Sequence, residues 1–139
     1  MQAIGLQEGE RLVAAAFAKA AAEFHRPICV AVCDTEGFLL AFARGDGAPV
    51  RSIQISQGKA YSAARLGVNT DAFLERLHRE NIAVGYFCDD RLTALPGGAV
   101  LKNSGGKVLG GVGISGLTSA EDQSIACALA ELLAKDAVS

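Results

Sequence analysis

The chain has 139 residues, of which half are apolar and 20% are charged, and its formal net charge is −2. This length predicts a single domain, residues 1–139, that buries a core without the help of disulfides. The small net charge gives no general attraction to nucleic acid or to an anionic membrane surface, so we expect neither as a partner. The first ten residues lack a secretion signal and no apolar run could cross a bilayer, which predicts a cytoplasmic protein.

The first part of the chain predicts a helix followed by a β-hairpin. Apolar residues recur with a helical period over Leu6–Phe24, and Pro27 prevents the helix from continuing. Two apolar runs, Ile28–Val32 and Phe38–Ala43, predict strands joined by a turn that contains Gly37. A helix and a hairpin therefore open the fold.

The middle of the chain predicts two helices and one short strand. Apolar residues from Ile53 to Leu66 are typical of a helix that ends near Gly67. Thr70 is a candidate cap for a short helix that extends to about His78. The apolar run Ile82–Cys88 predicts a further strand.

The last part predicts a second hairpin and a final helix. Ala99–Leu101 and Val108–Ser115 are the expected strands, with a glycine-rich turn between them. Ser119 and Asp122 have the spacing of a capping box at the start of the last helix. Two hairpins imply antiparallel pairing, so we predict an α+β fold with a central antiparallel sheet of about five strands flanked by helices.

Four cysteines raise the question of a metal ion or a disulfide. Cys29 and Cys33 fall in one predicted strand, where four residues separate them by about 13 Å. That distance is too long for a shared ion or a disulfide bond. We therefore expect reduced, buried thiols and no metal site.

The stretch Gly111-Val-Gly113-Ile-Ser-Gly116 matches the G-x-G-x-x-G pattern of dinucleotide-binding proteins. A true site of that kind opens a β-α-β unit and needs an acidic residue about 20 positions later, after the next strand. Only 23 residues follow Gly116, and one helix uses most of them. We therefore interpret these glycines as positions where the backbone passes close to a neighbouring element.

Several short motifs occur together in a specific order. "VAVCDTEGFLL", "RGDGA" and "GKAYSAA" precede "PGGAVL", "GKVLGGVGISG" and "EDQSIACALAEL". In this combination the chain resembles the GlcG/HbpS-type family, which also supplies the C-terminal domain of PduO-type corrinoid adenosyltransferases. The resemblance runs from about Leu6 to Leu133. It implies a profilin-like fold, a homo-oligomer of between two and eight subunits, and, for some members, haem binding.

Haem needs an axial ligand, an apolar wall and cations for its propionates. The chain has two histidines, His25 and His78. His25 follows Phe24 and precedes Arg26, and His78 stands between the arginines at 76 and 79. Both histidines are candidate haem ligands, although each is more typical of a solvated histidine in a charged helix end or loop.

A different set of polar residues suggests binding of a small molecule or catalysis. Motif residues at strand ends, loops and helix starts form this set: Arg44, Asp46, Lys59, Gly97, Gly98, Ser115 and Asp122. Lys59 and Arg44 could hold a carboxylate, and Asp122 or Asp46 could move a proton. The structural alternative is that Asp46 and Asp122 cap local elements and that Lys59 is a solvated helical lysine.

Three functions follow from these residues and from the resemblance. Our first hypothesis is a small-ligand-binding protein, with haem or a related tetrapyrrole as the ligand. The second is a small catabolic enzyme that transfers a proton on an organic acid, as a tautomerase does. The third is an accessory module that acts through its oligomeric interface.

Overall fold

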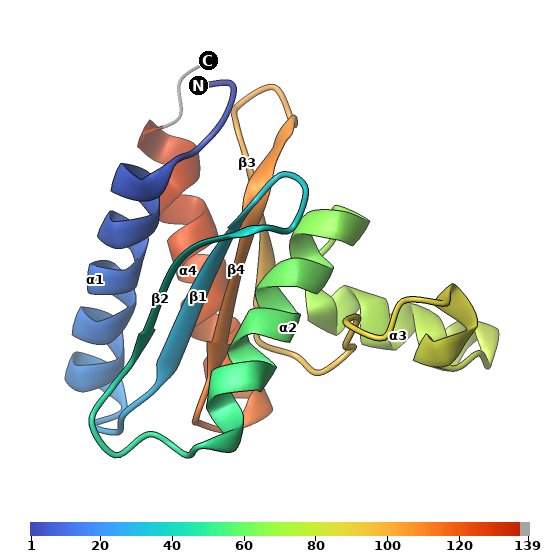
Figure 1. Cartoon of the computed structure of the whole chain (residues 1–139), viewed down its shortest axis with the longest axis horizontal. Coiled ribbons are helices and arrows are strands. Elements are labelled where there is room, and N and C mark those ends of the chain that lie inside the picture. Colours follow the sequence, from blue (N-terminus) through green and yellow to red (C-terminus); the bar gives the residue numbers. More distant parts are fainter. Residues whose placement is uncertain (137–139) are drawn as a thin grey trace.

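A computed structural model of the chain describes residues 1–136 and forms a four-stranded sheet with helices on both faces (Figure 1). The elements in chain order are α1 Leu6–Glu23, β1 Cys29–Asp34, β2 Leu39–Arg44, α2 Arg51–Leu66, α3 Thr70–Glu80, the 3₁₀ turn η1 Val84–Phe87, β3 Gly98–Lys102, β4 Val108–Ser115 and α4 Ser119–Asp136. Helices α1 and α4 cover one face of the sheet and α2 covers the other, while α3 projects away from the body (Figure 1).

The strand order is β2-β1-β4-β3, and every neighbouring pair is antiparallel. The two local hairpins, β1-β2 and β3-β4, are joined side by side through β1 and β4, which pair from Cys29 opposite Ser115 to Asp34 opposite Gly110. The α+β class and the antiparallel sheet predicted from sequence are confirmed.

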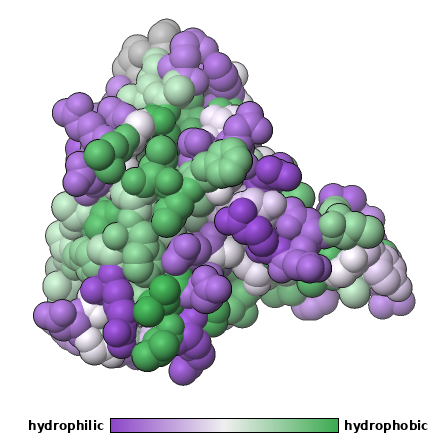
Figure 2. All heavy atoms as spheres, in the orientation of Figure 1, coloured by the Kyte–Doolittle hydropathy of each residue, from purple (hydrophilic) through white to green (hydrophobic). Residues whose placement is uncertain are grey.

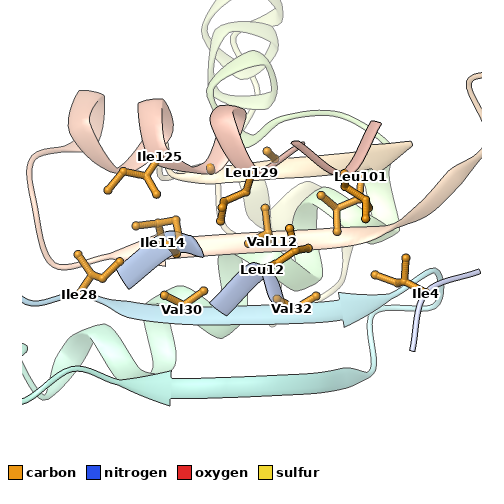
Figure 3. Packing of buried hydrophobic residues seen from close by; sticks show 14 of the residues in the cluster. Ile4, Leu12, Ile28, Val30, Val32, Leu101, Val112, Ile114, Ile125 and Leu129 are labelled. Carbon is orange, nitrogen blue, oxygen red and sulfur yellow. The ribbon is translucent and has the colours of Figure 1, made fainter. Parts of the chain in front are cut away.

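The main core lies between the sheet and the α1/α4 layer. Alternate residues of β1, Val30 and Val32, point into it and meet Leu12 of α1 and Leu129 of α4 (Figure 3). All four are at most 2% exposed. This burial explains the helical apolar period of the first helix, because its apolar stripe faces the strands.

The opposite face of the sheet is flat because its central strand carries glycines. A Cβ at Gly113 would overlap the backbone of α2 at Ser56, and one at Gly111 would overlap the carbonyl of Ala60. Helix α2 therefore packs directly on the β4 backbone. The G-x-G-x-x-G stretch allows this close helix-to-strand approach, which confirms its interpretation from sequence.

Two expectations about the middle of the chain are wrong. The sheet has four strands rather than about five, because the expected strand Ile82–Cys88 instead contains the 3₁₀ turn η1, and Asn81 and Cys88 on either side of it are left-handed. Its backbone has no neighbouring strand edge to pair with, because this segment lies beside the projecting α3 and away from the sheet (Figure 1). Cys88 is exposed, contrary to the expectation of buried thiols.

The helix caps also differ from the expected ones. Thr70 is the first residue of α3 rather than its cap, and its hydroxyl accepts a hydrogen bond from the amide of Gly98 at 2.8 Å. At the start of α4 the reciprocal bonds join Thr118 and Glu121, one position before the predicted box. Asp122 is therefore available for a different partner.

None of the helices in residues 1–136 is both long and apolar enough to cross a bilayer.

Candidate functional site

A buried ion pair lies where α2, α4 and the end of β4 meet. The Lys59 ammonium is 3.2 Å from a carboxylate oxygen of Asp122 and donates to the carbonyl of Ile114 at 2.7 Å. The other carboxylate oxygen accepts the amide of Leu117 at 3.1 Å. Lys59 is 1% exposed and Asp122 is 3% exposed, so Lys59 is not a solvated helical lysine.

Burial acts on both charges of this pair in the direction that disfavours ionisation. Loss of solvent lowers the pKa of Lys59, and the nearby Asp122 carboxylate opposes that shift. Loss of solvent likewise raises the pKa of Asp122, against the effects of Lys59 and of the Leu117 amide. For each group the partner's charge therefore opposes the effect of burial on the pKa without reversing its direction.

Glycine closes the cluster on the side of β3. Gly97 has a φ of +127°, and a Cβ there would lie 2.5 Å from the Lys59 nitrogen. Its amide donates to the side chain of Gln123 at 2.6 Å, and its carbonyl accepts the amide of Ile114 at 2.8 Å. The ammonium group is thus enclosed by backbone, which holds the start of β3 against α4.

The predicted polar residues divide into two groups. Lys59, Gly97 and Asp122 meet in the buried cluster, and Gly98 adjoins it. Ser115 follows Ile114 on β4, is 5% exposed and donates to the hydroxyl of Ser52 at 3.1 Å. These five residues therefore lie close together in the interior.

The other two predicted residues, Arg44 and Asp46, lie at the end of β2 and in the loop that follows it. The Arg44 guanidinium donates to the carbonyl of Ala48 at 2.7 Å and 3.1 Å. Asp46 is exposed in the same loop. Within residues 1–136, neither side chain hydrogen-bonds to a residue of the buried cluster.

Sequence reasoning missed two polar residues that complete this region. The Gln123 amide donates to the carbonyl of Gly98 at 2.9 Å, and its oxygen accepts the amide of Gly97. The Thr70 hydroxyl also binds Gly98. Gln123 follows Asp122 in the "EDQ" motif, which was the available signal, but its partners lie about 25 residues away and no local pattern identifies them.

A cleft of about 500 Å³ opens between α3 and α4 on the outer side of this cluster. We call it the α3–α4 cleft, and its lining residues are Asp71, Pro96, Ser119, Ala120, Gln123, Ser124 and Cys127. Helix α3 contributes only Asp71 to this lining, and all the other lining residues except Pro96 belong to α4. The cleft has small side chains along α4 and is open to solvent.

His78 does not line this cleft but lies on the same stripe of α3 as Asp71, which does. It is seven residues after Asp71, which lines the cleft, and residues seven apart in a helix share a face about 10 Å apart along the axis. Leu74 lies between them on the same stripe and is half-buried. His78 is exposed, so its ring is accessible.

Two arginines accompany His78 on α3. Arg76 pairs with Glu80 at 2.9 Å and lies over the ring of Phe87. The Arg79 guanidinium is 64% exposed and approaches Glu80 only at 4.0 Å. Arg79 is therefore the freer cation of the two.

His25 has different surroundings. It follows the last turn of α1 with a φ of +55° and is exposed. The end of α1 and the projecting α3 lie on opposite sides of the molecule in Figure 1, so the two histidines do not form one site within a subunit.

A family model and several solved structures of known proteins are similar to this chain over most of its length. The family model described as "Haem degrading protein HbpS-like" matches residues 4–131. A solved protein from Klebsiella pneumoniae, ORFY, is similar with 29% identity and a TM-score of 0.84, covering 96% of this chain and 92% of that one. No protein with a curated description matches the chain.

Two further solved structures are similar. HbpS has 28% identity and a TM-score of 0.83, with 96% of this chain and 92% of that chain covered. A complex of PduOC with haem has 23% identity and a TM-score of 0.80, with 93% and 94% covered. At that identity the likeness to PduOC concerns the fold.

Proposed function

The chain belongs to the HbpS-like family, and from this premise we propose that it binds haem or a related tetrapyrrole in the α3–α4 cleft, with His78 as the axial ligand. One observation carries the choice of site: an accessible imidazole shares a helix stripe with the wall of an open cleft. The proposal extends to self-association of the chain into a homo-oligomer.

The residues of the cleft fit the needs of a flat apolar ring system with two carboxylates. Pro96 and Ala120 of the lining offer apolar contact without bulk, and the half-buried Leu74 lies between Asp71 and His78 on α3. Small side chains such as Ser124 leave room for a planar group to lie along α4. A second cavity of about 350 Å³, between α2 and residues 90–95, lacks any side chain of the axial-ligand types in its lining.

Each residue has a separate role in this proposal. His78 binds the iron through a ring nitrogen, for which the imidazole must be neutral. The exposed Arg79 lines a different cavity, together with Ala72 and Phe73, so no propionate partner in the cleft is assigned to it. Bound haem would supply a redox-active iron to the site.

The test is a haem titration of the purified protein, followed by its visible spectrum. We expect a shifted Soret band for the wild type, and a loss of affinity of at least tenfold in His78→Ala. His25→Ala is the matched control, because it removes the other exposed histidine and leaves α3 unchanged, and it should keep the band. Cys127→Ala tests the remaining candidate ligand in the cleft and should also keep it.

The possible outcomes test haem binding and the assignment of His78 separately. Absence of a specific band in the wild type contradicts haem binding altogether. A band that is lost in His25→Ala or Cys127→Ala but kept in His78→Ala contradicts the assignment of His78, while haem binding stands.

The alternative of a proton-transferring enzyme has less support. Asp122, which would move the proton, and Lys59, which would hold the substrate carboxylate, are both nearly fully buried and bind each other. Arg44 and Asp46, the other residues of that hypothesis, belong to the loop after β2. A substrate would have to open the closed cluster before it could reach either charge.

A further inference from the structure

The cavity of about 350 Å³ between α2 and residues 90–95 is separate from the α3–α4 cleft, since no residue lines both. We call it the α2 cavity: Gln57 and Gly58 of α2 form part of one wall, and Arg91 and Thr93 form part of the other. Glycine at position 58 keeps the walls apart without filling the space between them, because a Cβ there would lie 3.6 Å from both Arg91 and Thr93. Ligand pockets in proteins have volumes of about 300 to 1,000 Å³, so this cavity suits a small molecule.

The wall opposite α2 is fastened to that helix at both ends. At one end the Tyr61 hydroxyl donates to the Asp89 carboxylate at 2.6 Å. At the other end the amide of Thr93 donates to the hydroxyl of Ser62 at 2.8 Å. Between them, the second carboxylate oxygen of Asp89 accepts the amide of Arg91 at 3.0 Å, which closes a turn. A ligand would therefore meet a wall that is already ordered, which lowers the entropic cost of binding.

Arg91 presents a cation to this cavity. Its guanidinium carbon lies 4.0 Å from the centre of the ring of the buried Tyr61, so stacking on that ring restricts the guanidinium. Among residues 1–136, no acceptor binds its guanidinium N–H groups and no carboxylate forms an ion pair with it. A stacked guanidinium with free N–H groups is suited to a carboxylate, which it can bind through two parallel hydrogen bonds.

An opposite charge and an acceptor line the same cavity. Asp90 precedes Arg91, is exposed, and forms no ion pair within residues 1–136. Consecutive Cα atoms are about 3.8 Å apart, so the two charges can act on one small ligand. The amide nitrogen of Gln57 donates to the carbonyl of Ile53 at 3.0 Å, and in the described part of the chain its amide oxygen has no donor. The cavity therefore offers an anion and a neutral acceptor beside the arginine.

Apolar side chains complete the lining, namely Ile55, Leu92 and Leu95. Leu95 is 42% exposed, so a ligand could still remove much of its surface from water. Figure 2 shows hydrophilic side chains gathered where α2 meets the projecting part of the chain, with hydrophobic ones over other parts of the same face. Charges of both signs thus lie next to apolar surface within one small cavity.

We propose that the α2 cavity binds a free α-amino acid with an apolar side chain. Arg91 binds the carboxylate of this ligand, and Asp90 with the amide oxygen of Gln57 binds its ammonium group. The apolar side chain of the ligand covers Leu92 and Leu95. A plain carboxylate would leave the acidic side of the cavity without a partner, and a plain amine would leave the arginine without one. The site goes beyond haem binding, because its lining contains no side chain that could ligate the iron.

The experiment is isothermal titration calorimetry of the purified protein with L-leucine at neutral pH. We expect saturable binding to the wild type. Two analogues of the same carbon skeleton test the two charges: α-hydroxyisocaproate lacks the ammonium group, and isoamylamine lacks the carboxylate. Each should bind about tenfold more weakly than leucine or worse, because each loses one charged hydrogen-bonding partner.

Variants assign the two charges to residues. Arg91→Gln should weaken leucine binding by about tenfold or more. Arg65→Gln is the matched control, because Arg65 also lies over the Tyr61 ring, at 5.3 Å, but does not line the cavity, and it should bind leucine as the wild type does. Asp90→Asn should remove the preference for leucine over α-hydroxyisocaproate. Circular dichroism verifies that each variant is folded.

Three results would overturn the proposal: no saturable binding of leucine, equal affinity for leucine and α-hydroxyisocaproate in the wild type, or unchanged leucine affinity in folded Arg91→Gln. Haem binding is measured with a different ligand and by a different signal, and the two cavities share no lining residue. Either kind of binding can therefore fail without affecting the result for the other.

Discussion

The buried cluster and the α3–α4 cleft lie on the two sides of α4's first turns, yet they differ in every physical respect. The cluster encloses Lys59 and Asp122 so completely that a methyl group on Gly97 would collide with the ammonium. The cleft is open and is lined on the α4 side by small residues such as Ala120 and Ser124. The motif residues Lys59 and Asp122 therefore stabilise the fold, while the α4 wall of the candidate ligand surface consists mainly of small side chains.

The largest expected effect comes from breaking the ion pair on one side. Lys59→Met leaves the Asp122 carboxylate buried without its cation, which should lower the free energy of unfolding by about 3 to 5 kcal/mol. Urea denaturation followed by circular dichroism measures this loss. A change below about 1 kcal/mol would mean that water reaches the cluster and that it is not closed.

A smaller effect is expected when both charges are replaced. Lys59→Met combined with Asp122→Leu should lie within about 1 kcal/mol of the wild type at neutral pH, because no unpaired charge remains. The comparison with the single variant shows whether the ion pair makes a net contribution to stability or only offsets the cost of burying its two charges.

The pH dependence of that double variant follows from the two pKa shifts. The folded-state pKa of Asp122 is raised by burial, so its contribution to stability is fully present below its usual value of 3.8 and is lost as pH rises through the folded-state pKa. The pKa of Lys59 is lowered by burial, so its contribution is present above 10.5 and is lost as pH falls through the folded-state pKa. The free energy of unfolding of the double variant, relative to that of the wild type, should therefore be highest near neutral pH and should fall toward acidic and alkaline pH. Urea denaturation across pH measures this difference.

The smallest effect on stability is expected in the cleft. Ser124→Phe fills the cleft from an exposed position, so it should change the free energy of unfolding by less than about 0.5 kcal/mol while it weakens haem binding at least tenfold. Lys135→Phe, at an exposed position in the last turn of α4, is the matched control and should affect neither quantity. Equal haem affinity in the two variants would place the ligand outside the cleft.

Local signals predicted much of the fold. The helical period over Leu6–Phe24 and the turn glycine at 37 gave the first helix and hairpin to within two residues. The prediction of a strand at Ile82–Cys88 was wrong because short apolar runs have the same pattern in a strand and in a packed turn. Only the absence of a neighbouring strand decides between them, and that depends on where α3 holds the segment.

The candidate site was predictable only in part. Lys59, Gly97 and Asp122 were selected from motifs, but their burial was not foreseen, since a lysine in a helix is usually solvated and an aspartate at a helix start usually caps it. Thr118 and Glu121 form the cap instead, which frees Asp122 to meet a lysine 63 residues away. Gln123 and Thr70 were missed because each acts on the backbone of a distant strand.

The sequence by itself determined the element types, the antiparallel pairing of each hairpin and the close approach at Gly111 and Gly113, because periodicity, turn chemistry and the lack of a Cβ act over a few residues. The tertiary structure alone decided which charges are enclosed and where a cleft opens. These properties depend on contacts between segments far apart in the chain, and no local pattern encodes the position of α3 relative to α4.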